Sequence, residues 1–161
     1  ITSSLTVLVE RPELAPAVDA VEISKSPAAA ISALTETFAR VYLANVHDVL
    51  TAIVFIHAVT GAAAMRTLLP LLDDATARRA VGLVWQGGAS LFATFGRRPF
   101  TVETIEPPRE SVADLVDHAV AHRDEHAIKF TEACLREHEL APSPAYLAAA
   151  RHVTGALPRP A

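Results

Sequence analysis

Residues 46–69 read VHDVLTAIVFIHAVTGAAAMRTLL and are followed directly by Pro70. Apolar residues stand on nearly every side of a helix drawn over this range, which is typical of a helix at the centre of a domain. A membrane span needs roughly 20 apolar residues, and the longest apolar run here, residues 52–59, is far shorter. We therefore expect a buried core helix and no membrane segment, with Pro70 ending the helix.

Helix start signals recur along the rest of the chain. Ser26-Pro27 combines an N-cap residue with proline at the first helical position, and it predicts a helix over about residues 28–44. Asp74 is the expected cap of a helix that runs to about residue 95 and ends before Gly96. Inside that helix, Gly87-Gly88 predicts a kink or a close approach of another helix.

Three further helices follow a proline-containing loop over residues 97–110. Ser111 and Asp114 have the spacing of a capping box, and Ser143-Pro144 opens the last helix, which ends near residue 155. Between them lies a helix over about residues 124–138. The sequence therefore predicts an all-α fold of about six helices packed as antiparallel neighbours.

Composition limits the class of protein. The chain has 161 residues, of which 51% are hydrophobic, and a net charge of −4. We expect one domain over residues 1–161, with a poorly defined start at 1–26 and a frayed tail at 156–161. A basic stripe for nucleic acid is missing. Cys134 is the single cysteine, so no internal disulfide forms, which favours the cytoplasm.

The segment DHAVAHRDEHAIKF, residues 117–130, contains most of the candidate metal-ligating side chains. On one continuous helix His118, His122, His126 and Lys129 fall at about 0°, 40°, 80° and 20° and share one face. Arg123 would then lie among apolar positions, which favours a break there, with Asp124 capping a new helix. In either case His126 and Lys129 are neighbours on a half-buried face.

Imidazole is the commonest metal ligand in proteins, so this face is a candidate metal site. Burial favours the neutral lysine amine, which can accept carbon dioxide to form a carbamate. The alternative is an ordinary solvated face beside Asp117, Asp124 and Glu125. His57, in the apolar helix, is either a core histidine bonded to a backbone carbonyl or part of a shared site. His47, on the same helix, is a weaker candidate.

Two segments resemble the questin oxidase family. The first runs from His57 to Thr60 and continues through residues 64–66 and 68–70; the second is DEHAIKFTEA, residues 124–133. The likeness extends over about residues 44–147, and its second segment is the more specific because the first is short and apolar.

The resemblance implies an all-helical oxygenase of polyketide secondary metabolism that opens an anthraquinone ring by Baeyer–Villiger-type insertion or dioxygenase cleavage. One branch is similar to non-haem iron enzymes whose Fe²⁺ is held by several histidines and a carboxylated lysine. Carried over by position, His57, His126 and Lys129 are the ligands, with Lys129 the carbamate and the catalytic residue. His122 is the next ligand and His118 follows it. Dioxygen is the co-substrate, and NADPH is the electron source in some members.

Family members are typically more than twice this long, and their N-terminal half supplies further histidine ligands. We therefore expect this chain to be the C-terminal part, with a second chain or an N-terminal half completing the site. One alternative is a non-catalytic helical module with a vestigial metal site, which binds a small apolar molecule or a partner helix. Another is a metal hydrolase, but its general base, Glu125, points away from His126.

Overall fold

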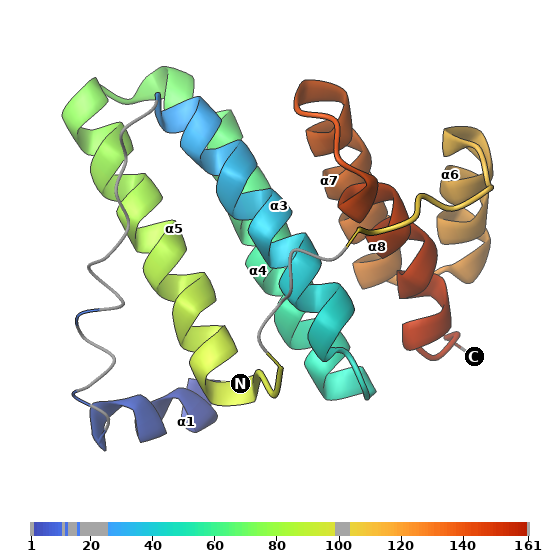
Figure 1. Ribbon diagram of the computed structural model, residues 1–161, viewed down its shortest axis with the longest axis horizontal. Helices are drawn as coiled ribbons and strands as arrows, with labels where there is room; N and C mark the ends of the chain where they lie inside the picture. The colour runs from blue at the N-terminus through green and yellow to red at the C-terminus, as the bar shows by residue number, and fades with distance from the viewer. Residues whose placement is uncertain (1, 11, 13–15, 17–25, 99–103, 161) are drawn as a thin grey trace.

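A computed structural model describes residues 2–10, 12, 16, 26–98 and 104–160, and the regular structure within them is helical with no strand. The all-α prediction is therefore confirmed (Figure 1). The elements are α1 (Thr2–Leu5), the 3-10 turn η1 (Thr6–Glu10), α3 (Pro27–Asn45), α4 (Val49–Leu68), η3 (Leu69–Leu71), α5 (Asp74–Phe95), α6 (Val112–His122), α7 (Glu125–Leu140) and α8 (Pro144–Ala156).

Short polar side chains set the starts of the six long helices. Each N-cap side chain accepts a hydrogen bond from a backbone N–H of the first turn, which satisfies a donor that has no partner inside the helix. The predicted caps at Ser26, Ser111, Asp124 and Ser143 are confirmed. The third predicted cap was wrong by one position, because Asp73 rather than Asp74 caps α5.

The predicted break between α6 and α7 lies at Arg123. This residue has a φ of 65°, in the left-handed region, and its backbone N–H donates to the carbonyl of Val120. Asp124 then accepts from the backbone N–H groups of His126 and Ala127. The chain therefore turns back at this point, so residues 117–130 do not form one continuous helix face.

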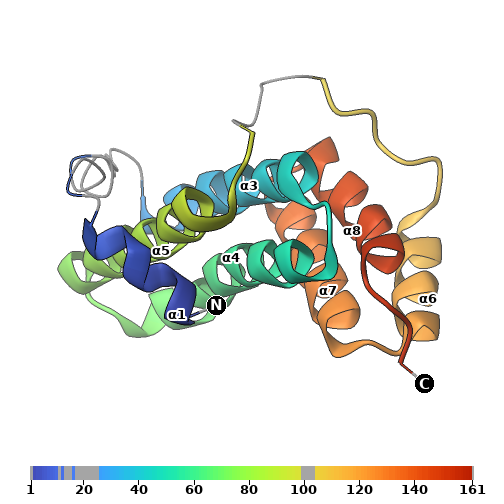
Figure 2. The ribbon, with the colours of Figure 1, turned by 90° about the horizontal axis from the view of Figure 1, so that it is seen from below.

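The long helices form two groups, α3–α4–α5 and α6–α7–α8, which meet along α3, α4, α7 and α8 (Figures 1 and 2). The short helix α1 lies against α5 (Figure 2). Between the two groups, α4 and α7 run in the same direction: His57 meets His126 near one end, and Arg66 pairs with Glu137 near the other. The alignment of α4 with α7 brings together the two histidines of the candidate site.

Helix α4 provides much of the core, as predicted. Val54, Ile56 and Val59 are fully buried, and they pack with Phe55 and with apolar side chains of α3, α7 and α8. The segment Val49–Leu71 is long and apolar enough to cross a membrane by composition alone, but half of its most apolar window is buried inside the fold. Core helices of soluble proteins share this pattern. One stripe of α4 nevertheless stays open, and His57 lies on it.

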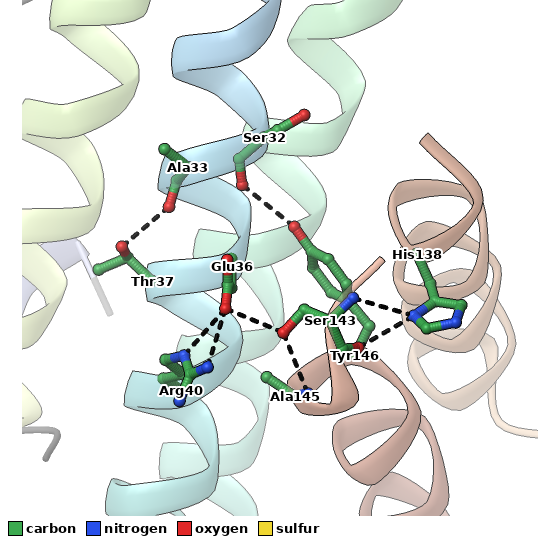
Figure 3. A network of polar contacts seen from close by, with 9 residues as sticks. All are labelled: Ser32, Ala33, Glu36, Thr37, Arg40, His138, Ser143, Ala145 and Tyr146. Atoms are coloured by element: carbon green, nitrogen blue, oxygen red, sulfur yellow. Dashed lines mark hydrogen bonds and ion pairs between the residues drawn. The ribbon is translucent and has the colours of Figure 1, made fainter. Parts of the chain in front are cut away.

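Polar contacts join α3 to the start of α8 (Figure 3). The Ser143 hydroxyl donates to Oε1 of Glu36 at 2.9 Å, and the Tyr146 hydroxyl donates to the carbonyl of Ser32 at 3.1 Å. Nδ1 of His138 lies 3.2 Å from the backbone nitrogen of Ser143 and closes the α7–α8 turn. These contacts fix the position of α8 against α3, and α8 in turn supports the buried face of α7.

Gly88 allows α5 to lie close to α3. A Cβ atom at this position would overlap the ring of Phe38, which is only 3% exposed. The Gly87-Gly88 pair therefore allows close packing, one of its two predicted roles. At Gly87 a Cβ would meet nothing within 4 Å.

We expect Gly88→Ala to lower the free energy of unfolding by about 1–3 kcal/mol, because a buried ring must shift. Gly87→Ala is the matched control: it gains the same helix propensity in open space and should stabilise the protein by up to about 1 kcal/mol. Urea unfolding of both variants checks this. Equal effects would show that Phe38 moves aside freely.

Candidate metal centre

Two histidines meet where α4 and α7 run side by side. The ring centres of His57 and His126 are 5.6 Å apart, and the ring planes make an angle of 67°. Two imidazoles bound to one ion, with metal–nitrogen bonds of about 2.0–2.1 Å, have ring centres about 5 Å apart. The ring-centre distance of the pair is therefore compatible with a shared metal ion.

The tautomer of His57 is set by the backbone. Its Nδ1 lies 2.7 Å from the carbonyl oxygen of Ile53, one turn earlier on α4. A carbonyl only accepts hydrogen bonds, so Nδ1 carries the proton and Nε2 keeps its lone pair in the neutral ring. The carbonyl bond matches the core-histidine interpretation, but the ring is exposed rather than buried. His57 therefore presents an unprotonated nitrogen at the surface of α4.

His126 lies in the first turn of α7. Its Nδ1 is 3.5 Å from a carboxylate oxygen of Asp124 and 3.9 Å from one of Glu125, so the expectation that Glu125 points away from His126 was wrong. Asp124 therefore has two roles, since the same oxygen accepts the backbone N–H of His126 at 2.8 Å. A carboxylate beside a ligating imidazole helps to orient the ring and raises its basicity.

Lys129 follows His126 by three residues and thus lies on the same side of α7. Its side chain is half-buried, as predicted. Within the ranges that the structure describes, the Lys129 amine makes no hydrogen bond or ion pair. The amine is therefore not committed to a structural contact.

His122 has a different environment from the pair. It is 3% exposed, at the end of α6, and its Nε2–H donates to the carbonyl of Leu157 at 3.1 Å. Its Nδ1 is buried and has no hydrogen-bond partner among the described residues. His122 thus holds the C-terminal end of α8 and keeps one lone pair unused.

The remaining histidines lie apart from the pair. His118 is exposed on α6. His47 precedes α4 instead of belonging to it, and its Nδ1 donates to the carbonyl of Asn45 at 2.8 Å, so the expectation that it shares the helix with His57 was wrong. His152, on α8, is exposed, but its Nδ1 lies 3.1 Å from the hydroxyl of the buried Tyr42. Burial lowers the pKa of His152 and raises that of Tyr42.

These residues fit a metal ion in part. No three His, Cys, Asp or Glu side chains converge in a metal-binding group within residues 2–10, 26–98 and 104–160. Two imidazoles are thus the conventional ligands present, and Lys129 is the nearby side chain whose carboxylated form would add an anionic oxygen. Cys134, on α7, is buried in the core, where desolvation raises the pKa of its thiol and disfavours the thiolate form.

Comparison with known proteins decides the family. The sequence model of the family described as questin oxidase-like matches residues 3–134, well over half of the chain. The chain belongs to the questin oxidase-like family. The match begins much closer to the N-terminus than the two resembling segments and contains both, while α8 lies beyond it. No curated protein and no solved structure matches the chain.

Membership in the questin oxidase-like family indicates an oxidoreductase of the oxygenase kind, with a small-molecule substrate and dioxygen. The match covers α3, α4, α5 and α6 and the first part of α7, so the likeness extends beyond the two resembling segments to most of the fold. It gives no support to the expectation that a second chain or an N-terminal half completes the site.

One structural feature was missed by the sequence interpretation. Arg66, within the first of the two segments that resemble the family, forms an ion pair with the fully buried Glu137 through two hydrogen bonds. The signal was the position of Glu137 itself: it lies seven residues after Phe130 and three after Cys134, so on a helix it must share their buried side. A carboxylate placed there needs a partner.

Proposed function

We propose that the chain is an oxygenase of the questin oxidase-like family that inserts oxygen into, or cleaves, the ring of an anthraquinone-type aromatic at a non-haem Fe²⁺ centre. The proposed ligands are His57, His126 and a carboxylated Lys129, which also serves as the catalytic residue. The observation that carries the proposal is the pairing of His57 with His126 across α4 and α7, with the His57 Nε2 lone pair unused.

The chemistry of the donor set supports iron. Neutral imidazoles together with an anionic oxygen are the ligands that non-haem Fe²⁺ takes in oxygenases. Bound iron would supply the activation of dioxygen. An insertion reaction also requires two electrons from outside, for which a reduced nicotinamide such as NADPH is the proposed source; a dioxygenase cleavage places both oxygen atoms in the product and requires none.

The protein's own groups would position this centre. The Ile53 carbonyl fixes the ring of His57, and the Asp124 carboxylate anchors the start of α7 and lies beside His126. His122 would join as a further ligand through Nδ1, because Nε2 is bonded to Leu157. This requires His122 and the pair to come closer than they are here. A reducing location such as the cytoplasm suits Fe²⁺ and the single thiol.

Metal content tests the proposal. We expect wild-type protein, expressed with iron and bicarbonate, to hold iron near one ion per chain by elemental analysis. His126→Ala should lose nearly all of it, because one of two imidazoles is removed. His47→Ala is the control and should retain the iron, since His47 bonds to Asn45 and lies outside the pair. Equal iron in all three proteins, or none in the wild type, would contradict the proposal.

A second candidate is a non-catalytic helical module with a vestigial metal site. The small number of conventional ligands favours it, as do apolar side chains that remain exposed on α6. The module predicts no stoichiometric metal and no turnover of anthraquinones with dioxygen. Wild-type protein that binds iron and consumes dioxygen in the presence of an anthraquinone would exclude it.

A further inference from the structure

A groove lies between α6 and α7. The groove encloses about 720 Å³, within the range of roughly 300–1,000 Å³ that is typical of small-molecule sites. The side of α7 that carries Ile128 and Leu135 lines the groove, whereas His126 meets His57 on the side facing α4. The groove is thus a different place from the candidate metal centre.

Branched aliphatic side chains form its walls. Val112, Val116 and Val120 repeat every four residues along α6, and Ile128 and Leu135 face them from α7. The three valines and Ile128 are 41–58% exposed, so a row of apolar side chains remains in contact with water. Covering such a row is favourable by about 25 cal/mol per Å² of apolar surface.

One end of the groove is polar. Because α6 and α7 are joined by a tight turn at Arg123, Val112 lies towards the C-terminal half of α7, where Glu132, Arg136 and Glu139 also line the groove. The Arg136 guanidinium reaches Glu132 at 3.0 Å, and its Nε is buried without a hydrogen-bond partner in the described ranges. Two carboxylates against one guanidinium leave an excess of negative charge.

Thr131 provides an independent observation. It lines the groove at 2% exposure, and its hydroxyl oxygen is buried without a hydrogen-bond partner in the described part of the chain. Buried polar groups in folded proteins are nearly always hydrogen-bonded, and an unpaired one calls for an explanation such as an absent ligand. Thr131 therefore adds an unpaired buried hydroxyl to the lining of the groove.

We propose that the α6–α7 groove binds a small, neutral, apolar molecule that carries a hydroxyl group, such as a hydroxylated arene. The aliphatic walls take the apolar body. The hydroxyl group meets the polar end, where it donates to a carboxylate of Glu132 or Glu139. A carboxylate ligand is disfavoured there, because it would meet that negative charge and lose its hydration.

The test is a titration of metal-free protein, kept in chelator, with 2-naphthol, followed by its fluorescence. We expect one saturable site, and binding of 2-naphthoate weaker by roughly tenfold or more. Val116→Asp should weaken 2-naphthol binding by at least about tenfold, because it places a charge in the apolar wall. Leu83→Asp is the matched control: Leu83 is 60% exposed on α5, outside the groove, and should bind like the wild type.

His126→Ala separates this proposal from the metal centre and should leave 2-naphthol binding unchanged. Non-saturable binding, equal losses in Val116→Asp and Leu83→Asp, or a loss in His126→Ala would overturn the proposal. So would a dimer, seen by sedimentation, that Val116→Asp dissociates, because a second copy would then cover the groove.

Discussion

Replacing Arg66 by methionine should lower the free energy of unfolding by about 3–5 kcal/mol, because it leaves a buried carboxylate unpaired. Glu137 is fully buried, and Arg66 donates to its two oxygens from Nε at 2.8 Å and from an NH2 nitrogen at 2.6 Å. The same guanidinium reaches the Ser32 hydroxyl at 2.9 Å, so it also ties α4 to α3. The hydrogen bonds that Arg66 donates to Glu137 raise the pKa of Arg66, which therefore stays charged.

Two controls isolate the buried charge, and urea unfolding measures all the variants. Arg78→Met removes an exposed pair with Asp74 on α5 and should cost no more than about 1 kcal/mol. Adding Glu137→Leu to Arg66→Met should restore most of the lost stability, since an apolar replacement of both partners is often neutral. If Arg66→Met costs less than the Arg78 control, water reaches Glu137 and the pair is screened.

Helix positions could be predicted because their causes are local. Capping serines and aspartates act within three residues of themselves, and Pro70 acts on the turn before it. The break at Arg123 could be predicted because one continuous helix would place this charged residue among apolar positions. The one-residue error at α5 arose because Asp73 and Asp74 are equally good caps by type, and their order is decided by backbone geometry.

The surroundings of the site depended on contacts between distant residues. Helix α4 is apolar on nearly every side, so its pattern could not show that the stripe with His57 stays open. The sequence interpretation put His122 beside His126 because of their four-residue spacing. In the structure, a hydrogen bond to the carbonyl of Leu157, thirty-five residues later, holds the His122 ring elsewhere. The pattern did predict that His126 and Lys129 are neighbours, because residues three positions apart on a helix lie on the same side.

The open stripe of α4 and the turn at Arg123 together explain why the candidate centre is small. The turn directs α6 away from the start of α7, so the histidines of residues 117–130 separate into different environments. His126 stays beside α4, while His122 supports α8. A full ligand set on this scaffold therefore depends on chemistry added at Lys129 or on movement of His122.

Lys129→Ala should reduce iron affinity by at least about 100-fold if the carboxylated lysine is a ligand, since even groups that only orient a ligand are worth about 10–100-fold. Lys129→Glu should retain part of that affinity, because its carboxylate supplies an anionic oxygen without carbon dioxide. Lys25→Ala, at the only other lysine in the sequence, is the control and should match the wild type.

Carbon dioxide makes the prediction specific to the carbamate. Iron binding by wild-type protein should fall when bicarbonate is removed, whereas binding by Lys129→Glu should not change. A ligand formed from the neutral amine requires both carbon dioxide and an uncommitted lysine, and Lys129 meets the second condition because it has no ion pair among the described residues. If Lys129→Ala and Lys129→Glu bind iron equally, or bicarbonate has no effect on the wild type, Lys129 is not a carbamate ligand. The centre would then consist of His57 and His126 with a ligand from elsewhere.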